Sequence, residues 1–237
     1  MTNRAGSLAV LAGALWLAGT AVAAPITPTY SSFGTLAGAT FGGAGIPNNA
    51  VAITTLGDLT LGLTAHQRYA AAPVTNDGAG VFAAQAGVSA DPPSPADPHA
   101  TWNFGFYIGG ASASQYAFSL FYDFDPAALT DEAALGRTIA PTGSVTATAQ
   151  DSWNLGMDFL DANGPGIFNQ PSYASFDPNV AGQYSFALVA YSLIGNVLTE
   201  VARSAILVNV NAVPEPTSLA LAGLALVGLG LASRRKV

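Results

Sequence analysis

The chain has 237 residues, of which half are hydrophobic and only 9% are charged, and its formal net charge is −7. This acidic balance excludes the basic surface that binding to nucleic acid or to an anionic membrane surface requires. Cysteine is absent, which excludes disulfides, thiol catalysis and cysteine-based zinc sites.

The first 23 residues have the three parts of a secretory signal peptide. Arg4 supplies the positive charge, residues 8–17 form a short apolar segment, and the small residues Ala21 and Ala23 define a cleavage site. The apolar segment is too short for a permanent membrane span. We therefore expect residues 1–23 to be removed during export. Without this segment and the C-terminal tail at residues 213–237, the chain consists of residues 24–212, which we expect to be the exported domain.

Residues 24–212 are long enough for one domain with its own core. Apolar and polar residues alternate repeatedly along this region, which predicts half-buried strands. The predicted strands lie at 51–55, 59–64, 102–108, 116–124, 145–149, 153–159, 184–190 and 201–210. Many strands with almost no helix predict an all-β fold, specifically an antiparallel β-sandwich ectodomain.

The connections between these strands have their own signals. Residues 127–136 are expected to form one short helical turn that ends at Gly136. Residues 73–100 are expected to be a looser region that ends in an exposed proline-rich loop. Gly195-Asn196 is a predicted hairpin turn.

The inward faces of the predicted strands supply the expected core. Its members are Trp102, Phe104, Phe118, Trp153, Leu155, Phe186 and Leu188. Tyr107, Phe121 and Tyr191 fall on the opposite faces of their strands. Such aromatic side chains stack on sugar rings when they are exposed, but packing on a second face or at a sheet edge is the more frequent role.

Residues 213–237 form a three-part tail. Val213 to Pro216 is a stiff extended spacer, because proline lacks a backbone donor and restricts the residue before it. The apolar run from Thr217 to Ala232 spans roughly 24 Å as a helix. This is short for a hydrocarbon core of about 30 Å and requires local bilayer thinning. The basic cluster Arg234, Arg235 and Lys236 predicts a cytoplasmic C-terminus.

A Pro-Glu-Pro motif, a short apolar helix and a basic cluster, in this order, resemble the PEP-CTERM sorting signal of Gram-negative bacteria. The resemblance implies recognition by a membrane-embedded sorting enzyme of the exosortase type, with Pro214, Glu215 and Pro216 as the recognition residues. It also implies a transient anchor in the inner membrane, processing near the motif, and delivery to the cell surface or extracellular matrix. The alternative, a buried C-terminal core helix, leaves the three terminal cations unexplained.

Two pairs of aspartates are the candidate metal ligands. Asp123 and Asp125 flank Phe124 at a strand end, and Asp158 and Asp161 lie around the second tryptophan strand. Their hard carboxylate oxygens suit calcium, the one cofactor candidate. The alternative is that these acids begin turns and remain ionised in water.

Catalytic signals are weak throughout the chain. His66 and His99 are the only histidines, and neither has a second ligand at zinc spacing. No nucleophile elbow, zinc-protease motif or phosphate-binding loop occurs. The sequence therefore predicts no catalytic residue.

The leading interpretation is a non-enzymatic surface or matrix protein sorted by its tail. The second interpretation is a carbohydrate-binding β-sandwich module associated with exopolysaccharide, and a hydrolase is the third. An aromatic row beside an acidic groove favours sugar binding, whereas two facing carboxylates in a deep cleft favour hydrolysis.

Overall fold

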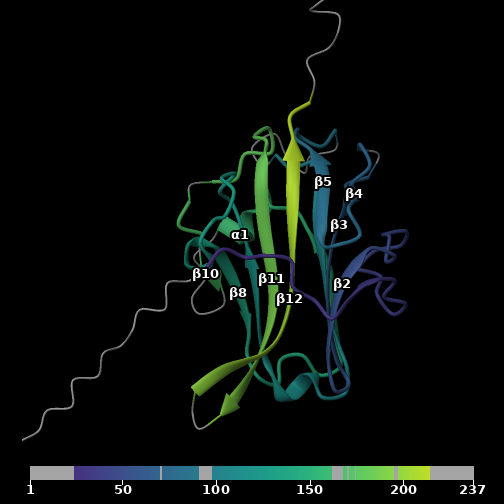
Figure 1. The fold of residues 1–237 in the computed structure, drawn as a ribbon, viewed down its shortest axis with the longest axis vertical. Helices are drawn as coiled ribbons and strands as arrows, with labels where there is room; N and C mark the ends of the chain where they lie inside the picture. The colour runs from purple at the N-terminus through teal and green to yellow at the C-terminus, as the bar shows by residue number, and fades with distance from the viewer. Residues whose placement is uncertain are drawn as a thin grey trace, which may run out of the picture.

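The computed structural model describes residues 24–69, 71–90, 98–161, 168–169, 171–173, 175–194 and 197–213. Within these residues the helical elements are short: α1 (Asp158–Asp161) and the 3₁₀ turns η1 (Ala113–Gln115) and η2 (Glu132–Ala134). The predicted all-β class is therefore confirmed (Figure 1). The predicted signal peptide and the apolar helix of the tail lie outside the described residues.

The strands form two sheets within the described part of the chain. The five-stranded sheet contains, in spatial order, β1 (Ser32–Gly34), β2 (Val51–Leu56), β3 (Leu59–Gln67), β6 (Trp102–Gly109) and β9 (Thr148–Trp153). The seven-stranded sheet contains β10 (Phe168–Asn169), β8 (Gly136–Ala140), β7 (Ala117–Tyr122), β11 (Gly182–Ile194), β12 (Val197–Asn211), β5 (Val81–Gln85) and β4 (Thr75–Asn76).

The pairing of β5 with β12 corrects the expectation of purely antiparallel sheets. β5 runs parallel to β12, with Val81 opposite Leu207 and Gln85 opposite Asn211. Residues 73–100 therefore contain a strand that the sequence analysis missed. By pairing with the last five residues of β12, β5 covers an edge that would otherwise present free backbone donors and acceptors.

The core lies between the two sheets. Phe104 on β6 stacks on Phe186 on β11, with ring centroids 4.6 Å apart, and Trp102 meets the same ring edge-on at 6.1 Å. Alternating residues of β3 and β11 are buried in the same cluster, as expected where strands bury one face. Six of the seven predicted core residues are buried, and Trp153 is only half-buried.

Hydrogen bonds join the two sheets along one side. The Ser204 hydroxyl on β12 donates to the carbonyl of Ala52 on β2 over 2.7 Å, and the Thr54 hydroxyl donates to the carbonyl of Arg203 over 2.7 Å. These bonds satisfy polar groups where β2 and β12 lie close together. On the opposite side, β9 is the edge strand of the five-stranded sheet.

The prediction of a strand at residues 153–159 is wrong, and the side chain of Asn154 explains why no strand forms there. Its side chain is fully buried, where its Oδ1 accepts from the backbone N–H of Ala100 over 2.8 Å and its Nδ2 donates to the carbonyl of Trp102 over 2.8 Å. These bonds hold the chain at the end of β9. A turn and α1 follow instead of further strand, because an asparagine side chain competes with the ladder for backbone groups.

Gly136 was predicted to end a helix, but it begins β8. The turn η2 covers only Glu132–Ala134 within the predicted 127–136 segment. A Cβ atom at position 136 would overlap the ring of Tyr122 on the neighbouring strand. Close packing against this aromatic ring therefore requires a glycine at position 136. In the sequence alone, such a glycine looks the same as one that ends a helix.

The outer faces of both sheets are partly covered. Ile26 and Leu135 pack on Phe121 outside the seven-stranded sheet, where Tyr191 is also half-buried. Tyr107 packs against a second cluster, formed by the loop that follows β1 and by β2. The interpretation of Phe121, Tyr107 and Tyr191 as second-face packing residues is confirmed.

The longest hairpin connects β11 and β12. Ile194 pairs with Val197, so the two strands form a hairpin, while the predicted turn residues Gly195 and Asn196 lie outside the described residues. Beyond a bulge at Ala190/Tyr191, the hairpin projects away from the rest of the fold (Figure 1). Its end lies opposite the end of β12 at Asn211, from which the chain continues toward the tail.

Candidate functional site

Three neighbouring strands place polar side chains beside one cleft. His66 lies on β3 opposite Asn103 on β6, and Ser152 lies on β9 opposite Gly105. The cleft has a volume of about 650 Å³ and runs between these residues and the loop 41–47. We call it the polar cleft.

Hydrogen bonds fix the orientation of the histidine in the polar cleft. Nδ1 of His66 lies 2.9 Å from the carbonyl oxygen of Gln67, and Nε2 lies 2.9 Å from the Ser152 hydroxyl. A carbonyl only accepts, so Nδ1 carries the proton and Nε2 accepts from Ser152. Burial lowers the pKa of His66 below its usual 6.5, which favours this neutral form.

The same chain of bonds continues into the core. Nδ2 of Asn103 donates to the Ser152 hydroxyl over 2.9 Å, and Oδ1 of Asn103 accepts from Asn154 over 2.7 Å. No sequence motif pairs His66 with Ser152, because the two residues are 86 positions apart. The serine and histidine have the hydrogen bond of a nucleophile and base, but the group behind the imidazole is a backbone carbonyl rather than a carboxylate.

Arg68 and Tyr69 form the rim of the polar cleft. The Arg68 guanidinium lies 4.7 Å from the centre of the Tyr69 ring, which exposes 67% of its surface. Nε of Arg68 is buried without a hydrogen-bond partner in the described part of the chain, so this nitrogen does not face the cleft and only the charge of the guanidinium acts there. The rim therefore offers an exposed aromatic face beside a cation.

The backbone around the polar cleft is held in uncommon conformations. Phe41 and Tyr69 both line the cleft and have positive φ values of 47° and 46°, which bulky residues rarely adopt. Gly42, with φ of 75°, approaches so closely that a Cβ atom there would lie 2.9 Å from Oδ1 of Asp151. Such strain persists where the surroundings hold the chain in place.

The aspartates that the sequence singled out lie in two places. Asp123 is 2% exposed, which corrects the expectation that these acids face water. Its Oδ1 accepts from the backbone N–H of Asp125 and its Oδ2 accepts from the Ser185 hydroxyl, both over 2.9 Å. Asp125 accepts from the N–H of Ala127 over 2.8 Å and begins a turn, as the alternative predicted.

Asp158 and Asp161 are the first and last residues of α1. Burial, followed by the charge of Asp158, raises the pKa of Asp161 above its usual value. Among the residues that the structure describes, no three histidine, aspartate or glutamate side chains are grouped closely enough to hold a metal ion. Calcium binding by these residues stays a prediction, and the geometry adds no support to it.

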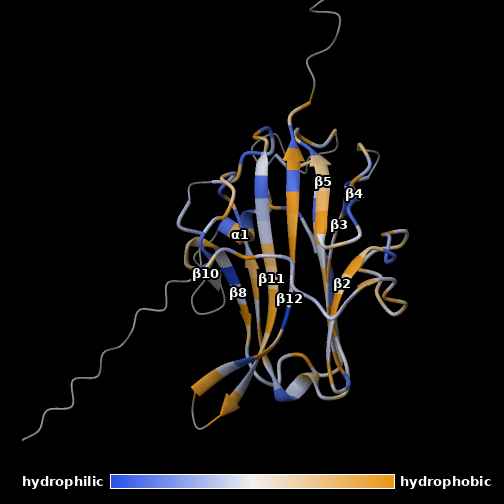
Figure 2. Cartoon of the chain, in the orientation of Figure 1, coloured by the Kyte–Doolittle hydropathy of each residue, from blue (hydrophilic) through white to orange (hydrophobic). Residues whose placement is uncertain are grey.

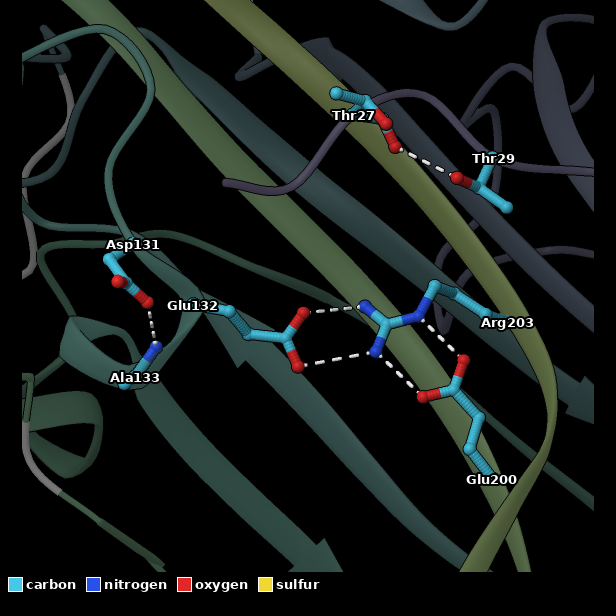
Figure 3. A network of polar contacts seen from close by, with 7 residues as sticks. All are labelled: Thr27, Thr29, Asp131, Glu132, Ala133, Glu200 and Arg203. Atoms are coloured by element: carbon cyan, nitrogen blue, oxygen red, sulfur yellow. Dashed lines mark hydrogen bonds and ion pairs between the residues drawn. The ribbon is translucent and has the colours of Figure 1, made fainter. Parts of the chain in front are cut away.

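A charged network on the other sheet connects β12 to η2. Arg203 donates to Glu132 over 2.7 and 3.2 Å and to Glu200 over 2.8 Å through each of two nitrogens (Figure 3). Hydrogen bonds to Glu200, followed by those to Glu132, raise the pKa of Arg203. Both carboxylates of this network contact the single guanidinium within the chain, so we interpret it as structural.

The residues of the predicted sorting motif and basic cluster lie outside the described residues, as do Ala21 and Ala23. The described part of the chain includes no helix of sufficient length and hydrophobicity to cross a membrane. The last described strand, β12, ends at Asn211, two residues before the end of the described chain at Val213.

Comparison with known protein families finds a match for the C-terminal segment of the chain. Residues 212–236 match the family model of the PEP-CTERM protein-sorting motif, which confirms the resemblance noted in the sequence. No curated protein and no solved structure matches the chain.

Proposed function

Because the chain carries a PEP-CTERM protein-sorting motif at residues 212–236, we propose that it is an exported protein that an exosortase-type enzyme sorts to the cell surface or matrix. The motif is the observation that carries this proposal. In this proposal residues 24–212 form a β-sandwich ectodomain that acts by position and contact, without catalysis. Residues 1–23 are its signal peptide, and residues 213–237 are its transient inner-membrane anchor.

The structure supports an independent ectodomain in front of the motif. The last strand, β12, ends at Asn211 and the motif match begins at residue 212. The fold has a shared core between two sheets and needs no disulfide, since the chain contains no cysteine. A processing enzyme acting near Pro214 would therefore leave the two sheets intact.

Mass spectrometry of the protein recovered from the cell surface tests the sorting proposal. We expect C-terminal peptides that end near the Pro-Glu-Pro motif. Changing Pro214, Glu215 and Pro216 together to Ala should retain the uncut chain in the membrane, and Pro141→Ala, in an exposed turn, is the matched control. Recovery of intact Arg234 to Val237 on the surface-exposed protein contradicts processing.

A second candidate function, carbohydrate binding, is favoured by the polar cleft. Sugar sites combine an aromatic face with polar groups that hydrogen-bond hydroxyls. Tyr69 supplies an exposed ring, Arg68 supplies a cation beside this ring, and Asp151 supplies acceptor oxygens on the cleft wall. On this proposal the exported protein would hold exopolysaccharide through the polar cleft.

Glycan-array screening followed by calorimetry of the exported protein tests the second candidate. Tyr69→Ala should weaken binding by more than tenfold, whereas Tyr173→Ala, at another exposed tyrosine, should leave the affinity unchanged. Equal effects of both changes, or no binding to neutral or uronate oligosaccharides, contradict the candidate. Hydrolysis of a bound glycan that Ser152→Ala abolishes would contradict the non-enzymatic part of the main proposal.

A further inference from the structure

The end of the β11–β12 hairpin carries an unpartnered apolar surface. Leu193, Ile194, Val197 and Leu198 each expose between 53% and 63% of their surface. Figure 2 shows the hydrophobic colour concentrated at this end of the hairpin. We call these four residues the apolar tip.

Both faces of the hairpin end are apolar. Leu193 pairs with Leu198, and Ile194 pairs with Val197. Since successive side chains of a strand point to opposite faces, each face carries one aliphatic pair. A partner surface can therefore bury either pair by accepting the side chains of one face.

The same molecule has such a cavity at its open side. A cavity of about 220 Å³ lies between the two sheets, where β9 is the edge strand. Phe106 and Trp153 line it from one sheet, Leu120 and Ile139 line it from the other, and Val145 lines it from the segment before β9. An apolar cavity of roughly 150 Å³ is enough to hold benzene, so this edge cavity has room for one aliphatic pair of the tip.

The apolar tip and the edge cavity are both free of charged side chains. No charged residue occurs from Ser192 to Thr199, and none lines the edge cavity. The contact would therefore bring no carboxylates together, although the net charge of the chain is −7. Removing apolar surface from water would stabilise the contact.

We propose that the Ile194/Val197 pair of the apolar tip of one copy inserts into the edge cavity of a second copy. The tip leaves its own sheet after the bulge at Ala190/Tyr191 and is exposed, so it does not fill the cavity of its own chain. Because tip and cavity are different surfaces, the contact is heterologous, and it links copies in succession unless the arrangement closes. This proposal goes beyond sorting and gives the chain a means of self-assembly.

The position of the tip suits contact between copies that share one surface. β12 runs from Val197 to Asn211, a path of roughly 46 Å at about 3.3 Å per residue. The tip therefore lies far from the end of β12 that continues toward the tail (Figure 1). A chain held by its tail would present the tip away from its own membrane and within reach of neighbouring copies.

Sedimentation velocity of the exported protein over a concentration series tests the proposal. We expect concentration-dependent assembly, weak because four side chains bury less surface than a standard interface. The double change Ile194→Ser with Val197→Ser should weaken assembly at least tenfold, and so should Ala149→Leu, which fills the cavity. Leu129→Ser, at another exposed leucine, is the control and should leave assembly unchanged.

Mixing the variants identifies the contact. The tip variant keeps its cavity and the cavity variant keeps its tip, so an equimolar mixture should form a heterodimer although neither variant assembles alone. If Ala149→Leu lowers the melting temperature, Ala140→Leu fills the same cavity from β8 and replaces it. A cavity variant that still dimerises would show tip-to-tip contact and overturn the proposal. A wild-type chain that stays monomeric, including one whose tip instead binds neutral lipid vesicles, would overturn it as well.

Discussion

The Ser185 hydroxyl donates a hydrogen bond of 2.9 Å to Oδ2 of Asp123 and thereby connects β11 to the residue that follows β7. Asp123 is 2% exposed, and its burial raises the pKa of its carboxyl from 3.8 to about 6. Hydrogen bonds from Ser185 and from the backbone oppose this shift only in part. The ionised Asp123 is therefore a source of instability at neutral pH.

The change Asp123→Asn should raise stability at pH 7. The folded chain holds the Asp123 proton up to about pH 6, whereas the unfolded chain loses it near pH 3.8. Stability contributed by this group therefore falls as pH rises through that window, by at most roughly 3 kcal/mol. An asparagine can accept from Asp125 through its Oδ1 and donate to the Ser185 hydroxyl through its Nδ2, although Nδ2 cannot accept the backbone and Thr130 donors that also reach the carboxylate.

Urea unfolding of wild type and Asp123→Asn between pH 3.5 and 8 measures this effect. The difference in unfolding free energy should grow from pH 4 to pH 6 and then stay constant. Asp77→Asn, at an exposed turn residue, provides the control. A constant difference across the whole range would show that Asp123 titrates normally.

His66 should be neutral at pH 7, with its proton on Nδ1. The carbonyl of Gln67 accepts from Nδ1, and burial lowers the pKa of the ring. The stability contributed by neutral His66 is lost as pH falls below the unfolded value of about 6.5, because only the unfolded chain readily accepts the proton there. This slope is opposite in sign to that of Asp123.

Nitrogen-15 NMR of the imidazole rings reads the His66 tautomer directly. We expect the Nδ1–H form above pH 7 and a titration midpoint below 6.5. Ser152→Ala should keep the same tautomer, since the Gln67 carbonyl is unaffected. Observation of the Nε2–H form in wild type would exclude the proposed direction of the Ser152 hydrogen bond.

Local pattern in the sequence predicted the strands that bury one face, such as β3, β6 and β11, because period-two alternation reports directly on burial. It missed β5, which pairs with a strand more than 120 positions later and whose own residues are mostly small. It also predicted a strand at 153–159, because the alternation continues there, whereas β9 ends at Trp153, just before the buried amide of Asn154. Only the tertiary fold supplies the hydrogen-bond partners that decide this boundary.

The sorting motif could be predicted because its residues are contiguous. The polar cleft could not, because His66, Asn103 and Ser152 come from three strands and no fixed spacing connects them. The one available signal in the sequence was a repeated tryptophan-asparagine pair, at Trp102-Asn103 and again at Trp153-Asn154. In the structure both asparagines belong to the same hydrogen-bonded chain, joined over 2.7 Å.

Trp102 and Trp153 should differ in their contribution to the free energy of unfolding. Trp102 is 2% exposed and packs on Tyr184 and Phe186, so Trp102→Ala should cost about 3–5 kcal/mol. Trp153 is half-buried on the edge strand β9, where its indole donates to Asp151 over 3.0 Å, so Trp153→Ala should cost less. Urea denaturation of both variants makes the comparison, and equal losses would contradict the assignment of Trp153 to the edge.

Arg203 should stabilise the fold mainly through Glu132. Glu132 lies 71 positions away in η2, and 22% of its side chain is exposed, whereas Glu200 lies three positions away on β12 and is 40% exposed. The local pair can form in the unfolded chain too, but the long-range pair exists only after folding. Glu132→Gln should therefore cost about 1 kcal/mol and Glu200→Gln less, since exposed pairs contribute little.

A double-mutant cycle of Arg203→Gln with each glutamate change separates the two pairs. The coupling energy with Glu132 should exceed that with Glu200, and both should shrink as salt rises from 0.05 to 1 M because of screening. Arg203→Gln alone should cost more than either glutamate change, since it leaves Glu132 and Glu200 facing one another without their cation. A larger coupling with Glu200, or couplings that do not respond to salt, would show that the ion pairs do not hold η2 against β12.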